Sequence, residues 1–473
     1  MPHHEPPLTV ARLAFLLLPA LWLALVVAGP IQWADSGYFI HEASQGPVFS
    51  PGLGALSHPT YHLLTRLVHE VFGSWGVAYI NPALALALTW TLFRLGRTLG
   101  LNQDWASIAA VCATLAHCCF WVGSKVEVYS LHLLLVLAAH WVCFDDTLRW
   151  SLARRLITLG LLTGLAVTTH QLTLVVLLPL YVWMLVRVRT QLWWIIPGVL
   201  IGLAPAYPAL MHELGTGKAL FDVIRHYLTG HSPTASANWE RAFLRIDLMW
   251  RDKSYVAIWV LSLLGLQAAG LWPLWQDART RVLWFAAAMN ALFAMSYAVS
   301  DRYTFFLPGA AMLALLGCVR LQAMFQGKSH AWVWVGRVAA FTSPLLLTLV
   351  WGGIQMGWLK PPTHAVSTPP RDDVRYFMVP YMPDQSATVF VQQQLAHTPD
   401  GALILADYTP LGALNSAKAA GLLPTRSAAL CDTLRGQELP EGDVFLVRET
   451  YCDHMRAQFN LSRTPAGWRV QPR

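Results

Sequence analysis

Asp35 is the first residue whose type and position suggest chemistry. It lies in the triplet Asp35-Ser36-Gly37, just after an apolar run that ends near residue 29. A carboxylate placed there can take a proton from a hydroxyl nucleophile, an effect typically worth about 10²–10⁴-fold in rate. A structural alternative also exists, because Asp35 and Ser36 could cap a short helix or form a turn with Gly37.

The loop that contains Asp35, residues 30–74, is long and rich in ionisable side chains. Loops beyond about 12–15 residues are often functional. His58 and His62 stand four residues apart, but no carboxylate completes a metal site at standard spacing. Contact with a lipid headgroup, or simple packing, is therefore favoured over metal ligation. Apolar residues at helical spacing over 60–72 predict an amphipathic helix in the plane of a membrane interface.

Three further places carry polar candidates between or within apolar runs. Lys125 and Glu127, followed by Tyr129, lie between two runs and could form a structural ion pair. His170 interrupts an apolar stretch, where a histidine is usually hydrogen-bonded to the backbone. Arg302 follows Asp301 and could simply pair with it. Ionisable residues at a membrane boundary also mark functional sites, and an arginine can contact a phosphate with two parallel hydrogen bonds.

The elements that must position these residues are membrane-spanning helices. Hydrophobic residues make up 55% of the 473 residues and charged residues 12%, whereas soluble chains carry about 25% charge. The 22 Trp residues fit the two membrane interfaces, which favour this side chain. The net charge of +7 includes no dense Lys/Arg run, so the cations are expected to anchor cytoplasmic helix ends, and no nucleic-acid partner is expected.

About eleven spans are predicted, since a spanning helix needs about 20 mostly apolar residues. The first run is read as a span, with a cleaved signal peptide as the alternative. The runs are 11–29, 75–93, 105–122, 127–144, 156–169, 171–186, 192–211, 255–275, 282–299, 304–319 and 338–354.

Residues 156–186 decide the topology. As one helix they would be about 46 Å long at 1.5 Å per residue, well beyond the roughly 30 Å hydrocarbon core. Lys/Arg totals in the loops do not separate one helix from two. We favour two, because that places Asp35, Glu127, His170 and Arg302 on one face. The N-terminus is then cytoplasmic and the C-terminus periplasmic.

The chain after the last run differs in character. We divide it into a transmembrane domain, 1–359, and a small α/β domain, 360–473, that opens with a Pro-rich linker. "GALILADY" and "DVFLVRE" have the length and flanks of strands, and 386–397 is expected to be helical. Cys431 and Cys452 could pair if this tail lies outside the cytoplasm. No zinc-type Cys/His spacing occurs.

One outer surface would then carry two carboxylates, Asp35 and Glu127, with cationic or proton-donating groups. Such a set suits an inverting sugar transfer from a lipid phosphate. Asp35 would be the general base, and cations would stabilise the departing phosphate. Glu127 would orient the sugar or the acceptor. The expected substrate-binding residues are Tyr38, His58, Lys125, Glu127, Tyr129, His170 and Arg302.

Five segments in order resemble the protein O-mannosyltransferase-like branch of the GT-C membrane glycosyltransferases. They are "ADSGYF", "SHPTYHLLTRL", "EVYSLHLLL", "GLAVTTHQLTLVVLLP" and "DRYTFFLP", and they cover about 30–310. The resemblance implies a catalytic Asp at position 35, many spans, a polyprenyl-phosphate sugar donor, transfer on the periplasmic or lumenal face, and a soluble domain after the last span. Tyr38 stands where this family usually has Glu, which makes it a candidate for substrate selection.

The sequence therefore predicts an all-α polytopic membrane protein, GT-C-like, with a small C-terminal α/β soluble domain, located in a bacterial inner membrane. The expected partners are a polyprenyl-phosphate-sugar lipid, an acceptor protein or glycan, and membrane lipids. No cofactor is predicted, and the need for a divalent metal stays open. The alternatives are a transporter or lipid flippase, for which no internal repeat is found, and a membrane scaffold.

Overall fold

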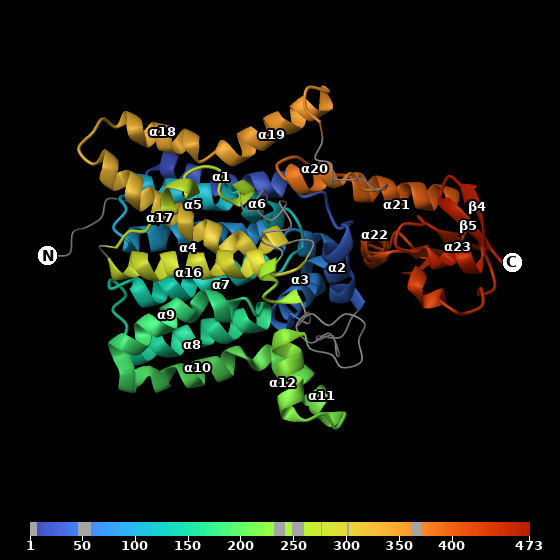
Figure 1. The fold of residues 1–473 in the computed structure, drawn as a ribbon, viewed down its shortest axis with the longest axis horizontal. Coiled ribbons are helices and arrows are strands. Elements are labelled where there is room, and N and C mark those ends of the chain that lie inside the picture. Colours follow the sequence, from blue (N-terminus) through green and yellow to red (C-terminus); the bar gives the residue numbers. More distant parts are fainter. Residues whose placement is uncertain are drawn as a thin grey trace.

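The chain folds into a bundle of long helices with a small α/β domain at one end (Figure 1). The computed structural model describes residues 7–45, 58–230, 242–247, 260–275, 277–299, 302–360 and 370–473. The C-terminus lies at the end of the long axis that carries the sheet domain (Figure 1). The predicted fold class, a helical membrane protein with a small C-terminal sheet domain, is confirmed.

The bundle is formed by helices that run mostly along the long axis and pack side by side (Figure 1). Its elements are α1 (Val10–Val26), α2 (Ala34–Gln45), α3 (Pro59–Ala78), α4 (Ile80–Thr98), α5 (Gln103–Leu115), α6 (His117–Gly123), α7 (Tyr129–Phe144), α8 (Leu152–Thr169), α9 (Thr173–Val188), η2 (Arg189–Trp194), α10 (Ile195–Gly202), η3 (Ala204–Ala206), α11 (Tyr207–Gly215), α12 (Leu220–Thr229), α15 (Gln267–Gly270), α16 (Ala278–Ser296), η5 (Arg302–Phe306), α17 (Leu307–Phe325), α18 (Ala331–Ala339) and α19 (Thr342–Gln355).

Several predicted spans are bent. Three helical stretches in the described residues are long and apolar enough to cross a membrane, namely Leu152–Thr169, Thr173–Gly202 and Tyr303–Phe325, and up to six if each bent pair counts as one span. Run 75–93 includes the 85° bend between α3 and α4. Run 105–122 includes the 65° bend between α5 and α6, and run 338–354 includes the 49° bend between α18 and α19. Run 255–275, in its described part, is interrupted by turns at 263–266. The count of eleven stays a prediction.

Residues 156–186 form two helices, as predicted. α8 ends at Thr169, His170 has extended backbone with φ −161°, and α9 begins at Thr173. The hydroxyls of Thr168 and Thr169 bond back to carbonyls one turn earlier, 2.9 Å from Gly164 O and 2.7 Å from Leu165 O. Such bonds compete with the helical ladder, so this polar stretch is a suitable place for the chain to reverse.

The predicted amphipathic helix is α3, which meets α4 at 85°. Pro82 lies in the first turn of α4, where its missing N–H costs nothing. Leu67, Val71 and Phe72 are more than half exposed along α3. A helix that crosses the bundle direction with an apolar side uncovered is typical of the membrane–water interface.

The C-terminal domain contains a five-stranded sheet in the order β2-β1-β3-β5-β4. β1 is parallel to β2 and β3, whereas β5 is antiparallel to β3 and β4. Cys431 and Cys452 form a disulfide. The two predicted strands (β1 and β3) and the predicted helix (α21) are confirmed. The elements are α20 (Asp373–Met378), α21 (Ser386–His397), β1 (Leu403–Ala406), α22 (Tyr408–Ala419), β2 (Ser427–Leu430), η6 (Cys431–Leu434), β3 (Val444–Leu446), α23 (His454–Gln458), β4 (Asn460–Thr464) and β5 (Gly467–Gln471).

The start of the predicted tail packs directly on the helix bundle. Trp121 Nε1 donates to Tyr376 O at 2.8 Å, and Trp22 Nε1 donates to Tyr381 O at 3.1 Å. The Tyr381 hydroxyl donates to Leu115 O at 2.9 Å and is buried. These contacts fix residues 376–381 against α1, α5 and α6, so the sheet domain begins from an anchored segment.

Candidate active site

Asp35 lies in the first turn of α2, at the end of the bundle that carries the C-terminal domain. The preceding residue, Ala34, has φ +49°, a left-handed conformation that costs a non-glycine residue about 1–3 kcal/mol. Such strain is found where the surrounding structure fixes a functional residue. Burial raises the pKa of Asp35, and a hydrogen bond from Tyr408 opposes that rise. A carboxylate with an elevated pKa is suited to proton transfer.

Glu127 is joined to the Asp35 segment through Ser36. The Ser36 hydroxyl donates to Glu127 Oε1 at 3.0 Å, and Glu127 is only 7% exposed. Ser36 is the immediate neighbour of Asp35 on α2. The structure therefore brings the two predicted carboxylate positions to one place, although they are far apart in sequence.

The loop that carries Lys125 and Glu127 is held by two buried amides. Asn81 Nδ2 lies 2.5 Å from Lys125 O and 2.9 Å from Glu127 O. Gln32 Oε1 accepts from Val126 N at 3.0 Å. Asn81 is fully buried and Gln32 is 7% exposed. A loop fixed at consecutive residues presents its side chains with little freedom, which is what a preorganised site requires.

Lys125 Nζ lies against two aromatic faces. It is 4.2 Å from the ring centroid of Trp121 and 4.6 Å from that of Tyr376. Burial lowers the pKa of Lys125 to about 7, although the nearby carboxylates of Asp384 and Glu127 favour its charged form. The ammonium group is thus only weakly solvated and is charged in part near neutral pH. An incoming anion would strengthen its charge, because an opposite charge nearby favours the protonated state.

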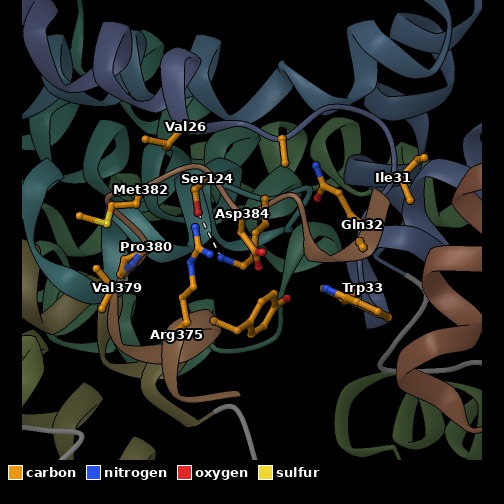
Figure 2. A pocket seen from close by; sticks show the side chains of 14 residues that line it. Val26, Ile31, Gln32, Trp33, Ser124, Arg375, Val379, Pro380, Met382 and Asp384 are labelled. Atoms are coloured by element: carbon orange, nitrogen blue, oxygen red, sulfur yellow. Dashed lines mark hydrogen bonds between the residues drawn. The ribbon is translucent and has the colours of Figure 1, made fainter. Parts of the chain in front are cut away.

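An open cavity enclosing about 520 Å³ lies beside Lys125 (Figure 2). The Arg375 side chain reaches toward Ser124 and Asp384 in this view (Figure 2). Another part of the wall is apolar. The cavity therefore combines a cationic end with a hydrocarbon wall. Its apolar lining residues are Val26, Ala28, Ile31, Val379, Pro380, Met382 and Ala387, and its aromatic ones are Trp33 and Tyr376.

His58, Tyr129 and His170 come together in a second group, here called the ring cluster, with His132 and Phe305. The His58 and His170 rings stack with centroids 5.6 Å apart, and Tyr129 lies 5.1 Å from His170. His132 and Phe305 lie 5.6 and 5.4 Å from His170. The ring cluster adjoins the carboxylates through the chain, since Tyr129 follows Glu127 by two residues.

The two predicted histidines of the ring cluster are neutral at pH 7. Burial lowers the pKa of His58 to about 4 and that of His170 well below its usual value. His58 Nδ1 is 2.7 Å from Thr169 O, and His170 Nδ1 accepts from Leu172 N at 3.1 Å. His58 and His170 can therefore contact a ligand through their ring faces and hydrogen bonds, whereas Lys125 can contact it through its charge.

The remaining candidates fall at the edges of this region. Tyr38 stacks on Tyr408 with ring centroids 4.7 Å apart. Arg302 begins η5, but its side chain lies outside the described residues, as does Asp301. His62 pairs with Glu42 at 3.2 Å. In the described part of the chain, the group with metal-ligand spacing is Cys431, Asp432 and His454, and Cys431 is already in the disulfide.

Sequence reasoning missed the contribution of the C-terminal domain. The Tyr408 hydroxyl donates a hydrogen bond to Asp35 Oδ1, and Arg375, Tyr376 and Asp384 line the cavity. One signal was present: Asp407 and Tyr408 end the predicted strand segment "GALILADY" and directly follow β1, and ligands of parallel α/β sheets lie at the carboxyl ends of strands. Asn81 was also missed, although it precedes Pro82 at the start of a predicted span.

Solved structures share this architecture. ArnT from Cupriavidus metallidurans bound to undecaprenyl phosphate has a TM-score of 0.59 at 13% identity, with 98% of each chain covered. The apo form of ArnT has a TM-score of 0.59 at 12% identity, with 98% of this chain and 97% of that one covered. No protein-family model and no curated protein matches the sequence. The chain thus has the fold of ArnT, which agrees with the predicted GT-C-like architecture. Its place in the O-mannosyltransferase-like branch stays a prediction.

Proposed function

We propose that this protein is an inverting membrane glycosyltransferase. It moves a sugar from a polyprenyl-phosphate donor to an acceptor hydroxyl of a protein or glycan. The observation that carries the proposal is the link between Asp35 and Lys125 through Glu127. Glu127 accepts a hydrogen bond from Ser36, the neighbour of Asp35, and favours the charged form of Lys125, which lines an open cavity with a partly apolar wall. A phosphate on an isoprenoid chain is complementary to this cavity, because its anion matches the Lys125 ammonium group and its hydrocarbon chain matches the apolar wall. The GT-C fold agrees with such a donor.

The proposed reaction is a single displacement. Asp35 accepts the proton of the acceptor hydroxyl as its oxygen forms a bond to the anomeric carbon. The bond between that carbon and the phosphate oxygen breaks, and its electron pair leaves with the polyprenyl phosphate. Lys125 balances the charge of the departing phosphate, and Arg302 is proposed to assist. Glu127 orients the sugar or the acceptor.

The ring cluster is proposed to line the donor site without charge. His58, Tyr129 and His170 would contact the substrate through ring faces and hydrogen bonds. Tyr38, which stacks on Tyr408 near Asp35, is proposed to influence substrate choice. In this proposal the charged residues near Asp35 stabilise the reacting groups, and the ring cluster recognises the shape of the donor.

The proposed active face is periplasmic, in a bacterial inner membrane. The site and the C-terminal domain share one end of the bundle (Figure 1). The disulfide between Cys431 and Cys452 supports an oxidising compartment for the C-terminal domain. The N-terminus would then be cytoplasmic.

Asp35→Asn tests the proposal. The substitution keeps the side-chain shape and removes the proton acceptor, so the transfer rate is expected to fall about 10²–10⁴-fold. The assay follows radiolabelled sugar from a set of undecaprenyl-phosphate hexoses into membrane acceptors. Asp453→Asn is the matched control, since Asp453 is exposed and its side chain makes no helix-cap hydrogen bond. Transfer at the wild-type rate by Asp35→Asn would refute the mechanism.

A further inference from the structure

Asp35 makes a hydrogen bond to the C-terminal domain. The donor is the hydroxyl of Tyr408, the first residue of α22, which contacts Asp35 Oδ1. The Tyr408 ring also stacks on Tyr38 at a 16° interplanar angle. The Tyr408 ring therefore packs on Tyr38 of α2, and the Tyr408 hydroxyl is hydrogen-bonded to Asp35, the proposed base.

The position of Tyr408 is fixed from within its own domain. Asp407 caps α22, accepting from Thr409 N at 3.2 Å. Arg448, which follows β3, donates two hydrogen bonds to the Asp407 carboxylate. Its Nε lies 2.6 Å from Oδ2 and its Nη2 lies 2.8 Å from Oδ1. Both side chains are largely buried. A bidentate pair of this kind fixes orientation as well as distance, so the N-terminus of α22 is held rigidly.

α22 is also seated closely on α2. A Cβ atom added at Gly37 would lie 2.1 Å from Gly412 O, and one added at Gly412 would lie 2.3 Å from Ala34 O. Only glycine lets the two backbones approach this closely. Ser416 Oγ accepts from Gln32 N at 3.1 Å across the same contact. The contact therefore sets the Tyr408–Asp35 distance through backbone geometry.

We propose that Tyr408 is a positioning residue that holds Asp35 as an oriented carboxylate, so that docking of the C-terminal domain completes the active site. This inference rests on the proposed function for the role of Asp35. With Oδ1 occupied by the tyrosine hydroxyl, Oδ2 is the oxygen that receives the acceptor proton. The tyrosine itself exchanges no proton with substrate.

The electrostatics around Asp35 support this assignment. Burial alone would favour the protonated, inactive acid, whereas a hydroxyl donated to the anion favours the carboxylate. The titratable groups that face Asp35 are Tyr408 of α22, Tyr38 of α2, Tyr376 of α20 and Glu127 of the loop before α7. Of these, Tyr408 is the group that donates a hydrogen bond to Asp35 in the described structure.

The first test reads the protonation of Asp35 without transfer. Dicyclohexylcarbodiimide modifies protonated carboxyl groups in apolar surroundings, and mass spectrometry of the Asp35 peptide gives the labelled fraction against pH in the full-length protein. In Tyr408→Phe the labelling midpoint should move up by about 1–2 pH units, the effect of one hydrogen bond to a charged group. The control Tyr451→Phe, an exposed tyrosine of the same domain, should not move it. An unchanged midpoint in Tyr408→Phe overturns the inference.

The second test measures transfer in the same variants. Tyr408→Phe should lower kcat about tenfold, leave KM for the lipid donor within about twofold, and shift the acidic limb of kcat/KM upward by the increment seen in labelling. Loss of activity without that shift would reduce Tyr408 to a packing role. A faster enzyme would mean that Tyr408 obstructs Asp35. A shifted labelling midpoint in a protein that transfers no sugar would refute the proposed function and leave the hydrogen bond in place.

Discussion

The carboxylate region and the ring cluster lie at the same end of the bundle, yet they are built differently. The first links Asp35 to Glu127 through Ser36, has Lys125 in the wall of an open cavity, and receives Tyr408 from the C-terminal domain. The second packs His58 and His170 among other rings, fully within the helices. Both regions contain ionisable residue types, and the first places one of them, Lys125, in the wall of an open cavity.

The difference shows that residue type does not determine chemistry in a membrane protein. Burial removes the charge from His58 and His170, because desolvation disfavours the charged form. Lys125 experiences burial as well, but Asp384 and Glu127 favour its ammonium form. We therefore expect substitutions in the carboxylate region to change rates strongly and those in the ring cluster to change them little.

Lys125→Met gives the largest expected effect among the tests of this comparison. It keeps the length of the side chain and removes the charge that would meet the donor phosphate. A hydrogen bond to a charged group contributes about 1.5–3 kcal/mol, so kcat/KM for the lipid donor should fall about 10–100-fold. Initial rates against donor concentration measure this. Lys328→Met, between α17 and α18, is the control, and an equal loss there would contradict the assignment.

The same residue predicts a pH effect with a definite sign. Lys125 is charged below its pKa of about 7 and loses its proton as the pH rises through that value. The wild-type kcat/KM, which reports groups of the free enzyme, should therefore decline on the alkaline side of pH 7. Lys125→Arg stays charged, so its profile should be flat there even if its absolute rate is lower. A matching alkaline decline in Lys125→Arg would assign that limb to another group.

Gly412→Ala comes next and tests whether the docked domain belongs to the carboxylate region. The added methyl group would lie 2.3 Å from Ala34 O, and overpacking of this kind costs about 1–3 kcal/mol. Separation of α22 from α2 should lower transfer about 5–20-fold. Gly215→Ala is the matched control, since a Cβ there meets no atom within 4 Å. Full activity in Gly412→Ala would mean that the domain contact does not matter for transfer.

His170→Phe should have the smallest effect. Phenylalanine retains the ring stack with His58, and the substitution loses the acceptor for Leu172 N. One neutral hydrogen bond contributes about 0.5–1.5 kcal/mol, so transfer should fall about two- to twelvefold, with an unchanged pH profile between about pH 6 and 8. His330→Phe, an exposed histidine at the start of α18, serves as the control. A loss as large as that of Lys125→Met would place the ring cluster in the chemistry.

Much of the framework could be predicted from local sequence. The polar break at Thr168 to Gln171 predicted two helices, and Asp35 stood out because it follows the first span. Strands β1 and β3 were recognisable from short apolar runs with polar flanks. Such features depend on neighbours in the chain, so one sequence contains enough information to find them.

The rest depends on contacts between distant residues. Nothing near Tyr408 indicates that its hydroxyl reaches a helix 373 residues away. The neutral state of His58 follows from burial against residues distant in sequence, such as Thr169 and His170, which no local pattern reveals. The bend between α5 and α6 occurs at Ala116, where the backbone is extended with ψ 143° without a proline or glycine. Tertiary packing, which overrides local preference, determines each of these.

The link between Asp35 and Tyr408 also bears on how the protein is made. Asp35 enters the membrane with the first helix, whereas Tyr408 is synthesised 373 residues later. During that interval the growing chain would possess the proposed base without the residue that orients it. If lipid donors are already present in the same membrane, a nascent or truncated chain would act on them more slowly than the complete protein. The order of synthesis would then delay full activity until the C-terminal domain has folded.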